Sequence, residues 1–215
     1  MIKFKQFISE EALVARKDAS SKTLHAFDMD ETLFHHDHSK VKVHVLNKQG
    51  DRVQSLTNQE FNTHKLPPGH SYDFSEFRST HIFKQSAHPI HKMIRKLKAI
   101  HKNNKNVEIV TARSDMDDKV GFMHALKQHG IDPKEIHVRR AGNLPGKPGE
   151  VKRKVIGDLI KKHGYKKVHL YDDSETNLNH FLSLKQDHPD VELHAHHIHH
   201  NPETNETKIK TRIIK

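Results

Sequence analysis

The chain has 215 residues with a formal net charge of +10, and 33% of them are hydrophobic, which suits one large domain or a domain with an inserted element. It contains no cysteine, which excludes disulfides and thiolate metal sites and fits a reducing compartment such as the cytoplasm. Because no run of about 18 apolar residues is present, we expect no membrane-spanning segment.

The N-terminal residues 2–18 place apolar residues among charged ones, which predicts an amphipathic helix, and the linker after it ends near residue 22. The segment has acids and no continuous apolar stretch, so we expect neither a secretory signal nor an organelle transit peptide. MIKFKQFISEE resembles the targeting peptide of internal head proteins of tailed phages, where an apolar residue, any residue and Glu precede a maturation cut. Ile8, Ser9 and Glu10 match it. The resemblance implies removal of residues 1–10 and packaging from the host cytoplasm into the virion head; an ordinary helix is the alternative.

The next part of the chain begins with a short apolar strand, TLHAFDM, which starts at residue 23 and runs into two aspartates. Residues 41–56 alternate on both sides of a turn that contains Gly50, which predicts a β-hairpin. Residues 57–87 are expected to be irregular. We interpret residues 35–87 as an insertion into the domain that spans residues 23–215.

The rest of the chain alternates between strands and helices. Helices are predicted at residues 88–102, 115–130, 150–164 and 175–186, and strands at residues 107–111, 136–138, 167–171, 191–198 and 207–214. Pro89 is expected in the first turn of its helix, and Gly130 and Gly164 just past two helix ends. This alternation predicts an α/β fold with a parallel sheet between two layers of helices.

Polar residues follow three of the predicted strands. They are Asp28, Asp30 and Thr32 after the first strand, Thr111 and Arg113 at the second, and Asp172, Asp173 and Asn177 after the strand at residues 167–171. Ligands of an open parallel sheet bind beyond the carboxyl ends of its strands, so we expect these side chains to meet at one edge. Gathered carboxylates need a cation, and a ligand set made only of oxygens favours Mg²⁺.

These motifs resemble those of the haloacid-dehalogenase-like (HAD) phosphohydrolases. The first motif of that superfamily is an apolar strand followed by Asp-x-Asp-x-Thr, the second a strand that ends in Thr or Ser, the third a Lys near a helix start, and the fourth a strand followed by paired acids. Residues 23–200 contain all four in this order. The resemblance implies a Rossmann-like three-layer fold with a minimal cap and a Mg²⁺-dependent phosphatase activity.

The resemblance also implies roles for the two aspartates of the first motif. Asp28 would attack phosphorus and form an aspartyl-phosphate. Asp30 would protonate the leaving oxygen and then deprotonate water. Mg²⁺ would be held by Asp28, the backbone carbonyl of Asp30 and Asp172, with Asp173 acting through water.

The phosphoryl group would be gripped by Thr111 and a lysine. Lys152 opens the helix before the fourth motif and is our choice, with Lys147 and Lys154 as alternatives. Thr32 either contacts phosphate or caps a turn. Arg113 either grips the substrate or pairs with Asp115.

The substrate class is suggested by a local excess of positive charge. Residues 134–167 contain eleven Lys or Arg and three acids, a net charge of +8, which suits a polyanion; solvated helix faces are the alternative. Together with an open site, this charge favours nucleotides or polynucleotide ends, and the HAD domains of RNA-repair-type and polynucleotide 3′-phosphatase proteins are similar. A nucleic-acid or protein binding module on a HAD scaffold is the alternative from another class.

Histidine is unusually frequent, with 23 residues and a cluster at residues 194–200. We interpret these imidazoles as surface residues without a shared role. A zinc or nickel site in the cluster is the alternative interpretation.

Overall fold

The computed structural model describes residues 21–37, 39–103 and 106–215. The predicted N-terminal helix, most of its linker and the targeting motif at Ile8 to Glu10 therefore lie outside the described residues. None of the helices in the described part combines the length and apolar composition that crossing a bilayer requires.

The main sheet has six strands in the order β11-β10-β9-β1-β7-β8. Their bounds are β1 (Thr23–Phe27), β7 (Asn106–Thr111), β8 (His137–Arg140), β9 (Lys167–Asp172), β10 (Glu192–Asn201) and β11 (Glu206–Ile214). Every pair of neighbours is parallel except β10 with β11 at one edge. The predicted α/β fold with a mostly parallel sheet is confirmed. The strand order reverses between β1 and β9, and such a switch point is where open α/β sheets bind ligands.

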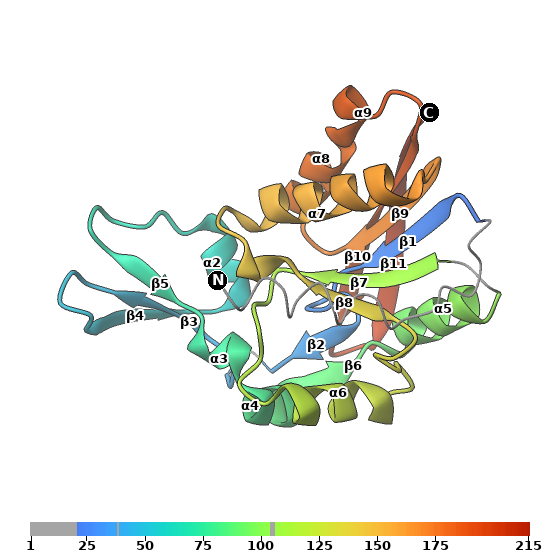
Figure 1. Ribbon diagram of the computed structural model, residues 1–215. Coiled ribbons are helices and arrows are strands. Elements are labelled where there is room, and N and C mark those ends of the chain that lie inside the picture. Colours follow the sequence, from blue (N-terminus) through green and yellow to red (C-terminus); the bar gives the residue numbers. More distant parts are fainter. Residues whose placement is uncertain (1–20, 38, 104–105) are drawn as a thin grey trace.

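The helices cover both faces of this sheet (Figure 1). They include α5 (His91–Lys102), α6 (Lys119–Gln128), α7 (Pro148–His163), α8 (Glu175–Leu182) and α9 (Leu184–Asp187). On β1, Leu24 and Ala26 pack with α7 and α8, whereas Phe27 packs with α5 and α6. This alternation follows from the period of two along a strand and makes β1 buried on both faces, as central parallel strands are.

The ends of the helices depart from the prediction at several places, and α6, predicted at residues 115–130, begins only at Lys119. Pro89 is the last residue of strand β6 (Ala87–Pro89), and α5 begins after it at His91, so the placement of Pro89 in the helix was wrong. The single helix predicted at residues 175–186 is divided at Ser183 into α8 and α9. Gly164 ends α7 in the left-handed conformation with φ 62°, as its position predicted.

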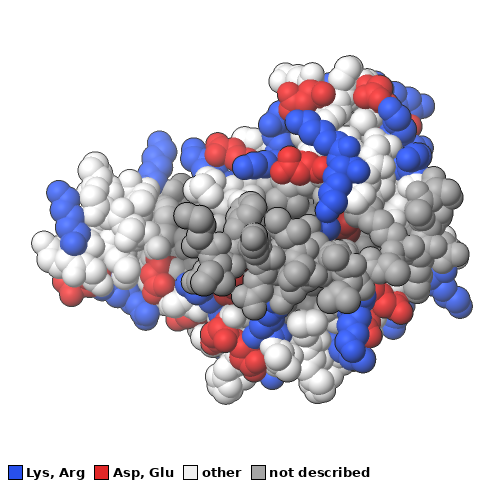
Figure 2. All heavy atoms as spheres, viewed as in Figure 1, with Lys and Arg blue, Asp and Glu red and all other residues white. Residues whose placement is uncertain are grey.

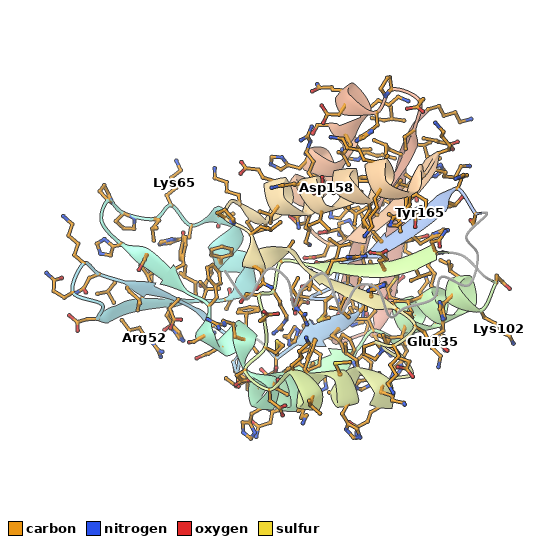
Figure 3. All side chains as sticks on the ribbon, viewed as in Figure 1. Arg52, Lys65, Lys102, Glu135, Asp158 and Tyr165 are labelled. Carbon is orange, nitrogen blue, oxygen red and sulfur yellow. The ribbon has the colours of Figure 1, made fainter. Side chains whose placement is uncertain are left out.

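The segment between residues 37 and 86 is folded around a small sheet of its own. It begins and ends at a strand pair, β2 (Phe34–His36) with β6. The predicted hairpin is present as β3 (Val43–Leu46) and β4 (Arg52–Leu56), and β5 (Ser71–Asp73) pairs with β3. This sheet projects from the body of the molecule, and Arg52 and Lys65 lie far from the main sheet (Figure 3).

Residues 57–87 are more regular than the sequence suggested. They contain α2 (Asn58–Thr63), α3 (Ser75–Arg78) and α4 (Thr80–Ser86) in addition to strands β5 and β6. Thr57 and Glu60 form a capping box that starts α2, an arrangement that satisfies backbone N–H groups left unpaired at a helix start. The expectation of an irregular segment was wrong. Each helix or strand here is only a few residues long, too short to show a periodic pattern in the sequence.

Candidate active site

The carboxyl ends of β1 and β9 bring the first and fourth motifs together. The backbone N–H of Asp28 donates to the carbonyl of Tyr171 at 2.8 Å, which continues the parallel ladder by one residue. Asp172 ends β9 and is fully buried, and the side chain of Asp28 is 7% exposed. Buried carboxylates carry a large free-energy cost unless they are paired, so their partners decide what this site can do.

Lys152 lies between these two carboxylates. Its ammonium Nζ is 2.9 Å from Asp28 Oδ1 and 2.8 Å from Asp172 Oδ2, and its side chain is 2% exposed. The lysine comes from the second turn of α7, one turn before Ile156, which packs against the strands and so directs this side of the helix toward the sheet. Although burial opposes its charge, Asp172 and Asp28 hold the pKa of Lys152 above its ordinary value.

The other lysines that the sequence offered lie elsewhere. Lys147 is the exposed N-cap residue of α7, and Lys154 is exposed about two turns further along the same helix. The structure therefore brings Lys152 to the aspartates and leaves Lys147 and Lys154 at the surface.

Asp172 is oriented by the start of α8. Its Oδ1 accepts from the backbone N–H of Ser174 at 2.9 Å, and the Asn177 amide Nδ2 donates to Oδ1 at 3.1 Å and to Oδ2 at 3.3 Å. Asn177, which follows the fourth motif, thus holds the carboxylate of Asp172 in place.

Asp173 completes a group of three carboxylates. One oxygen from each of Asp28, Asp172 and Asp173 lies within 4.8 Å of the others. Burial raises the pKa of Asp28 to about 7, against the opposing effect of Lys152. Burial, followed by repulsion from Asp172 and Asp28, raises the pKa of Asp173 well above its ordinary value. A single ammonium therefore leaves the three carboxylates short of positive charge, and their oxygen-only donor set fits Mg²⁺.

Asp30 belongs to a second group of contacts, apart from this acidic cluster. Arg113 Nη2 is 2.7 Å from Asp30 Oδ1 and its Nε is 3.0 Å from both oxygens, while His36 Nε2 is 2.6 Å from Oδ1. Although burial alone would raise it, the Arg113 guanidinium and the His36 ring hold the pKa of Asp30 well below its usual range. Arg113 also donates to the carbonyl of Phe77 on α3, so the inserted segment helps to hold it.

The alternative pairing of Arg113 with Asp115 was wrong, because Arg140 Nε lies 2.8 Å from Asp115 Oδ1 instead. His36 was missed by the sequence analysis. Its ring is 3% exposed, and it joins β2 to Arg113, a residue 77 positions away. Only the strand pair β2–β6 places it there, and no local pattern marks it.

The two threonines have different surroundings. Thr111 Oγ1 accepts from the backbone N–H of Arg113 at 3.1 Å and so shapes the turn after β7. Thr32 is fully buried, and its Oγ1 has no hydrogen-bond partner among the described residues. A buried hydroxyl without a partner is costly, and no hydrogen bond of Thr32 Oγ1 within the described residues offsets that cost.

The positive charge of residues 134–167 is largely offset in three dimensions. Six of the eleven basic side chains are paired with acids outside that segment: Arg139 with Glu108, Arg140 with Asp115, Lys152 with Asp28 and Asp172, Arg153 with Asp187, Lys166 with Asp190, and Lys167 with Glu192. On the face shown in Figure 2, basic and acidic side chains are interspersed over the described residues.

Comparison of the chain with protein-family models, with curated proteins and with solved structures gives no match. The chemistry of the site therefore rests on the contacts described above.

Proposed function

We propose that this protein is a Mg²⁺-dependent phosphatase that forms an aspartyl-phosphate on Asp28 and acts on nucleotides or polynucleotide ends. The observation that carries the proposal is the group of Asp28, Asp172 and Asp173 at the switch point of the sheet, the first two of which are buried and contact the buried Lys152. A structural ion pair needs one carboxylate for one ammonium. The surplus of carboxylates, two of them with a raised pKa, supports the proposal of a cation site here.

In the first step, a carboxylate oxygen of Asp28 attacks phosphorus, and the bond from phosphorus to the leaving oxygen breaks. The leaving oxygen takes a proton from Asp30. In the second step, Asp30 takes a proton from water as that water attacks phosphorus, which releases phosphate and restores the carboxylate of Asp28. Lys152 and Thr111 hold the phosphoryl oxygens as negative charge develops on them.

The contacts of Asp30 define which of its two roles is ready in the free protein. Paired with Arg113 and His36, Asp30 is ionised, which is the form that accepts a proton. To act as an acid, Asp30 must be protonated, and this requires weaker contacts with Arg113 and His36. We infer that the substrate phosphoryl group draws the Arg113 guanidinium toward itself, which raises the pKa of Asp30. Asp30 then takes up a proton from solvent and donates it to the leaving oxygen, and it returns one proton to solvent after the second step.

Asp28, Asp172 and Asp173 would hold Mg²⁺, and when bound this ion would neutralise charge on the phosphoryl oxygens and orient them for attack. Lys152 alone supplies one positive charge at 2.8–2.9 Å from two of the acids.

The basic side chains of residues 134–167 bear on the class of substrate. Six paired basic residues leave fewer cations in residues 134–167 for a nucleic-acid backbone than the sequence suggested. A polynucleotide end bound through a few phosphates remains compatible with this surface, and its affinity would depend only modestly on salt.

The test compares wild type with Asp28→Asn in assays of phosphate release, with and without Mg²⁺. The substrates are mononucleotides, sugar phosphates, and DNA and RNA oligonucleotides with 3′- or 5′-phosphates. We expect the variant to lose about 10⁶-fold in rate, the size of loss that removal of a catalytic nucleophile causes in a well-studied hydrolase. Asp158→Asn is the control, because Asp158 is an exposed acid on α7 (Figure 3).

Each outcome has a separate meaning. Full activity in Asp28→Asn would overturn the mechanism. Equal turnover of sugar phosphates and oligonucleotide ends would overturn the preference for nucleic acid. If no substrate released a detectable amount of phosphate, the alternative of a nucleic-acid or protein binding module would be favoured.

A further inference from the structure

Three histidines come together on one face of the main sheet, away from the acidic cluster. His169 on β9 and His194 on β10 are direct neighbours in the parallel register, and His196 follows two residues after His194. The period of two places His194 and His196 on the same face of β10. This juxtaposition could not be read from the 194–200 cluster alone, because the third histidine comes from another strand.

The ring nitrogens of these three residues are close enough for one ion. One nitrogen from each of His169, His194 and His196 lies within 4.8 Å of the other two. His169 Nδ1 and His196 Nε2 are 3.0 Å apart. Two imidazole nitrogens on one tetrahedral Zn²⁺ are about 3.3 Å apart, as follows from Zn–N bonds of about 2.0–2.1 Å. The His169–His196 pair therefore needs to separate by only a few tenths of an ångström to hold the ion, and the His194 nitrogen, which lies within 4.8 Å of both, must approach the same point.

The outward nitrogens of two of these rings already have partners. His196 Nδ1 is 2.9 Å from Thr211 Oγ1 on β11, which leaves Nε2 directed at His169. His194 Nε2 is 2.5 Å from Glu192 Oε1. Contacts of this kind, with a hydroxyl or a carboxylate on the far ring nitrogen, fix the tautomer and orientation of metal-binding histidines.

Stacking holds the rings of the cluster in place. His25 stacks on His169 with ring centroids 4.3 Å apart and planes 9° from parallel, and Tyr171 stacks on His196 at 4.3 Å and 9°. The side chains are therefore preorganised, which lowers the entropy cost of binding an ion.

We propose that His169, His194 and His196 form a transition-metal site that takes Zn²⁺. Three imidazoles with an open fourth position are a ligand set that suits Zn²⁺, and imidazole ligands exclude Mg²⁺, which prefers oxygen. The site is separate from the acidic cluster, since His169 precedes Asp172 by three residues along β9, about 10 Å. The ion joins β9 to β10 and, through Thr211, steadies the edge strand β11.

The proposal needs a test that separates one specific site from weak binding by other histidines, because the chain has 23 of them. Co²⁺ replaces Zn²⁺ and absorbs visible light strongly only in a tetrahedral or similar site. The full chain, stripped of metal and supplied with excess Mg²⁺ to fill the acidic cluster, is titrated with Co²⁺ and then with Zn²⁺.

We expect one equivalent of Co²⁺ to give strong visible absorption and one equivalent of Zn²⁺ to remove it and raise the melting temperature. His196→Gln is expected to weaken Zn²⁺ binding by more than about 100-fold, and Glu192→Gln by about 10-fold. His124→Gln on α6 and His199→Gln at the far end of β10, both exposed, are matched controls that keep wild-type binding.

Two results would overturn the proposal. One is a wild-type protein whose Co²⁺ complex lacks the tetrahedral absorption, which requires no variant. The other is loss of the tight Zn²⁺ equivalent in His199→Gln while His196→Gln retains it. Circular dichroism of the metal-free variants separates a folded protein without a site from an unfolded one.

Discussion

Lys152 is a buried cation, and its removal would leave the carboxylates of Asp28 and Asp172 without a positive charge between them. Its Nζ is the nearest positive charge to Asp28 and Asp172 among the contacts at the strand ends. We predict that Lys152→Gln lowers the free energy of unfolding by about 3–5 kcal/mol, the cost of breaking a buried ion pair from one side. Urea unfolding in the presence of a chelator measures it.

Lys154→Gln is the matched control, since Lys154 is an exposed lysine of the same helix and is expected to cost less than about 0.5 kcal/mol. Addition of Mg²⁺ should restore part of the stability of Lys152→Gln, because the ion supplies positive charge to the same carboxylates. An unfolding free energy equal to that of wild type would show that Lys152 is not paired in solution.

Asp28 makes the opposite contribution to stability. Its pKa is raised to about 7 by burial, above its value of about 3.9 in an unfolded chain. Between these values the folded protein binds a proton that the unfolded chain does not, so stability falls as pH rises from about 4 to 7 and is then constant. Asparagine has no carboxyl group to ionise, so the stability of Asp28→Asn does not fall in this way between pH 4 and 7.

We therefore predict that, without metal, Asp28→Asn is as stable as wild type near pH 4 and more stable above pH 7. Thermal melts across this range measure the difference, at about 2–4 °C for each kcal/mol. A difference in melting temperature that does not vary with pH would contradict the raised pKa.

At the scale of elements, the turn after β7 is set by a close approach of backbone. Gly142 donates its N–H to the carbonyl of Arg113 at 3.2 Å, and a Cβ there would lie 2.1 Å from the carbonyl oxygen of Ala112. That oxygen is backbone and cannot rotate away. We predict that Gly142→Ala lowers stability by about 1–3 kcal/mol and reduces phosphate release, because Arg113 loses its position against Asp30.

Gly157→Ala provides the comparison, since its new Cβ would meet only side-chain atoms, Leu184 Cδ2 at 3.2 Å and His188 Nε2 at 3.8 Å, and alanine is favoured in a helix interior. It should leave stability within about 1 kcal/mol of wild type. If the two substitutions changed the free energy of unfolding equally, the turn at Gly142 would be able to adjust to an added Cβ at little cost.

Long periodic elements could be predicted from the sequence, whereas short and non-local ones could not. Strands β1, β7 and β9 are apolar runs between polar ends, and that pattern also predicted where Asp28 and Asp172 would meet. Pro89 was misplaced because the pairing of β6 with β2 depends on residues more than 50 positions apart. His36 was missed for the same reason, since its contact with Arg113 exists only after the inserted segment has folded.

At the scale of the whole molecule, the histidines of the main sheet make folding sensitive to acid. Burial, and then the neighbouring His25, lowers the pKa of His169 to about 2, and burial, and then His194, lowers that of His196 to about 4. Unfolded histidine has a pKa of about 6.5. Below pH 6.5 the unfolded chain therefore binds protons that the folded protein excludes, and this contribution to stability declines until about pH 4 for His196.

We predict that His196→Gln, without metal, loses less stability than wild type between pH 6.5 and 4, because glutamine takes up no proton in the unfolded chain. The exposed His124 gives the control His124→Gln, whose acid dependence should match wild type. Melting temperatures of the three proteins over this range measure the effect. Asp28 acts in the opposite direction over the same pH range, so the comparison is made between variants and wild type at each pH. Parallel curves for His196→Gln and wild type would mean that the ring of His196 is protonated as readily in the folded sheet as in the unfolded chain.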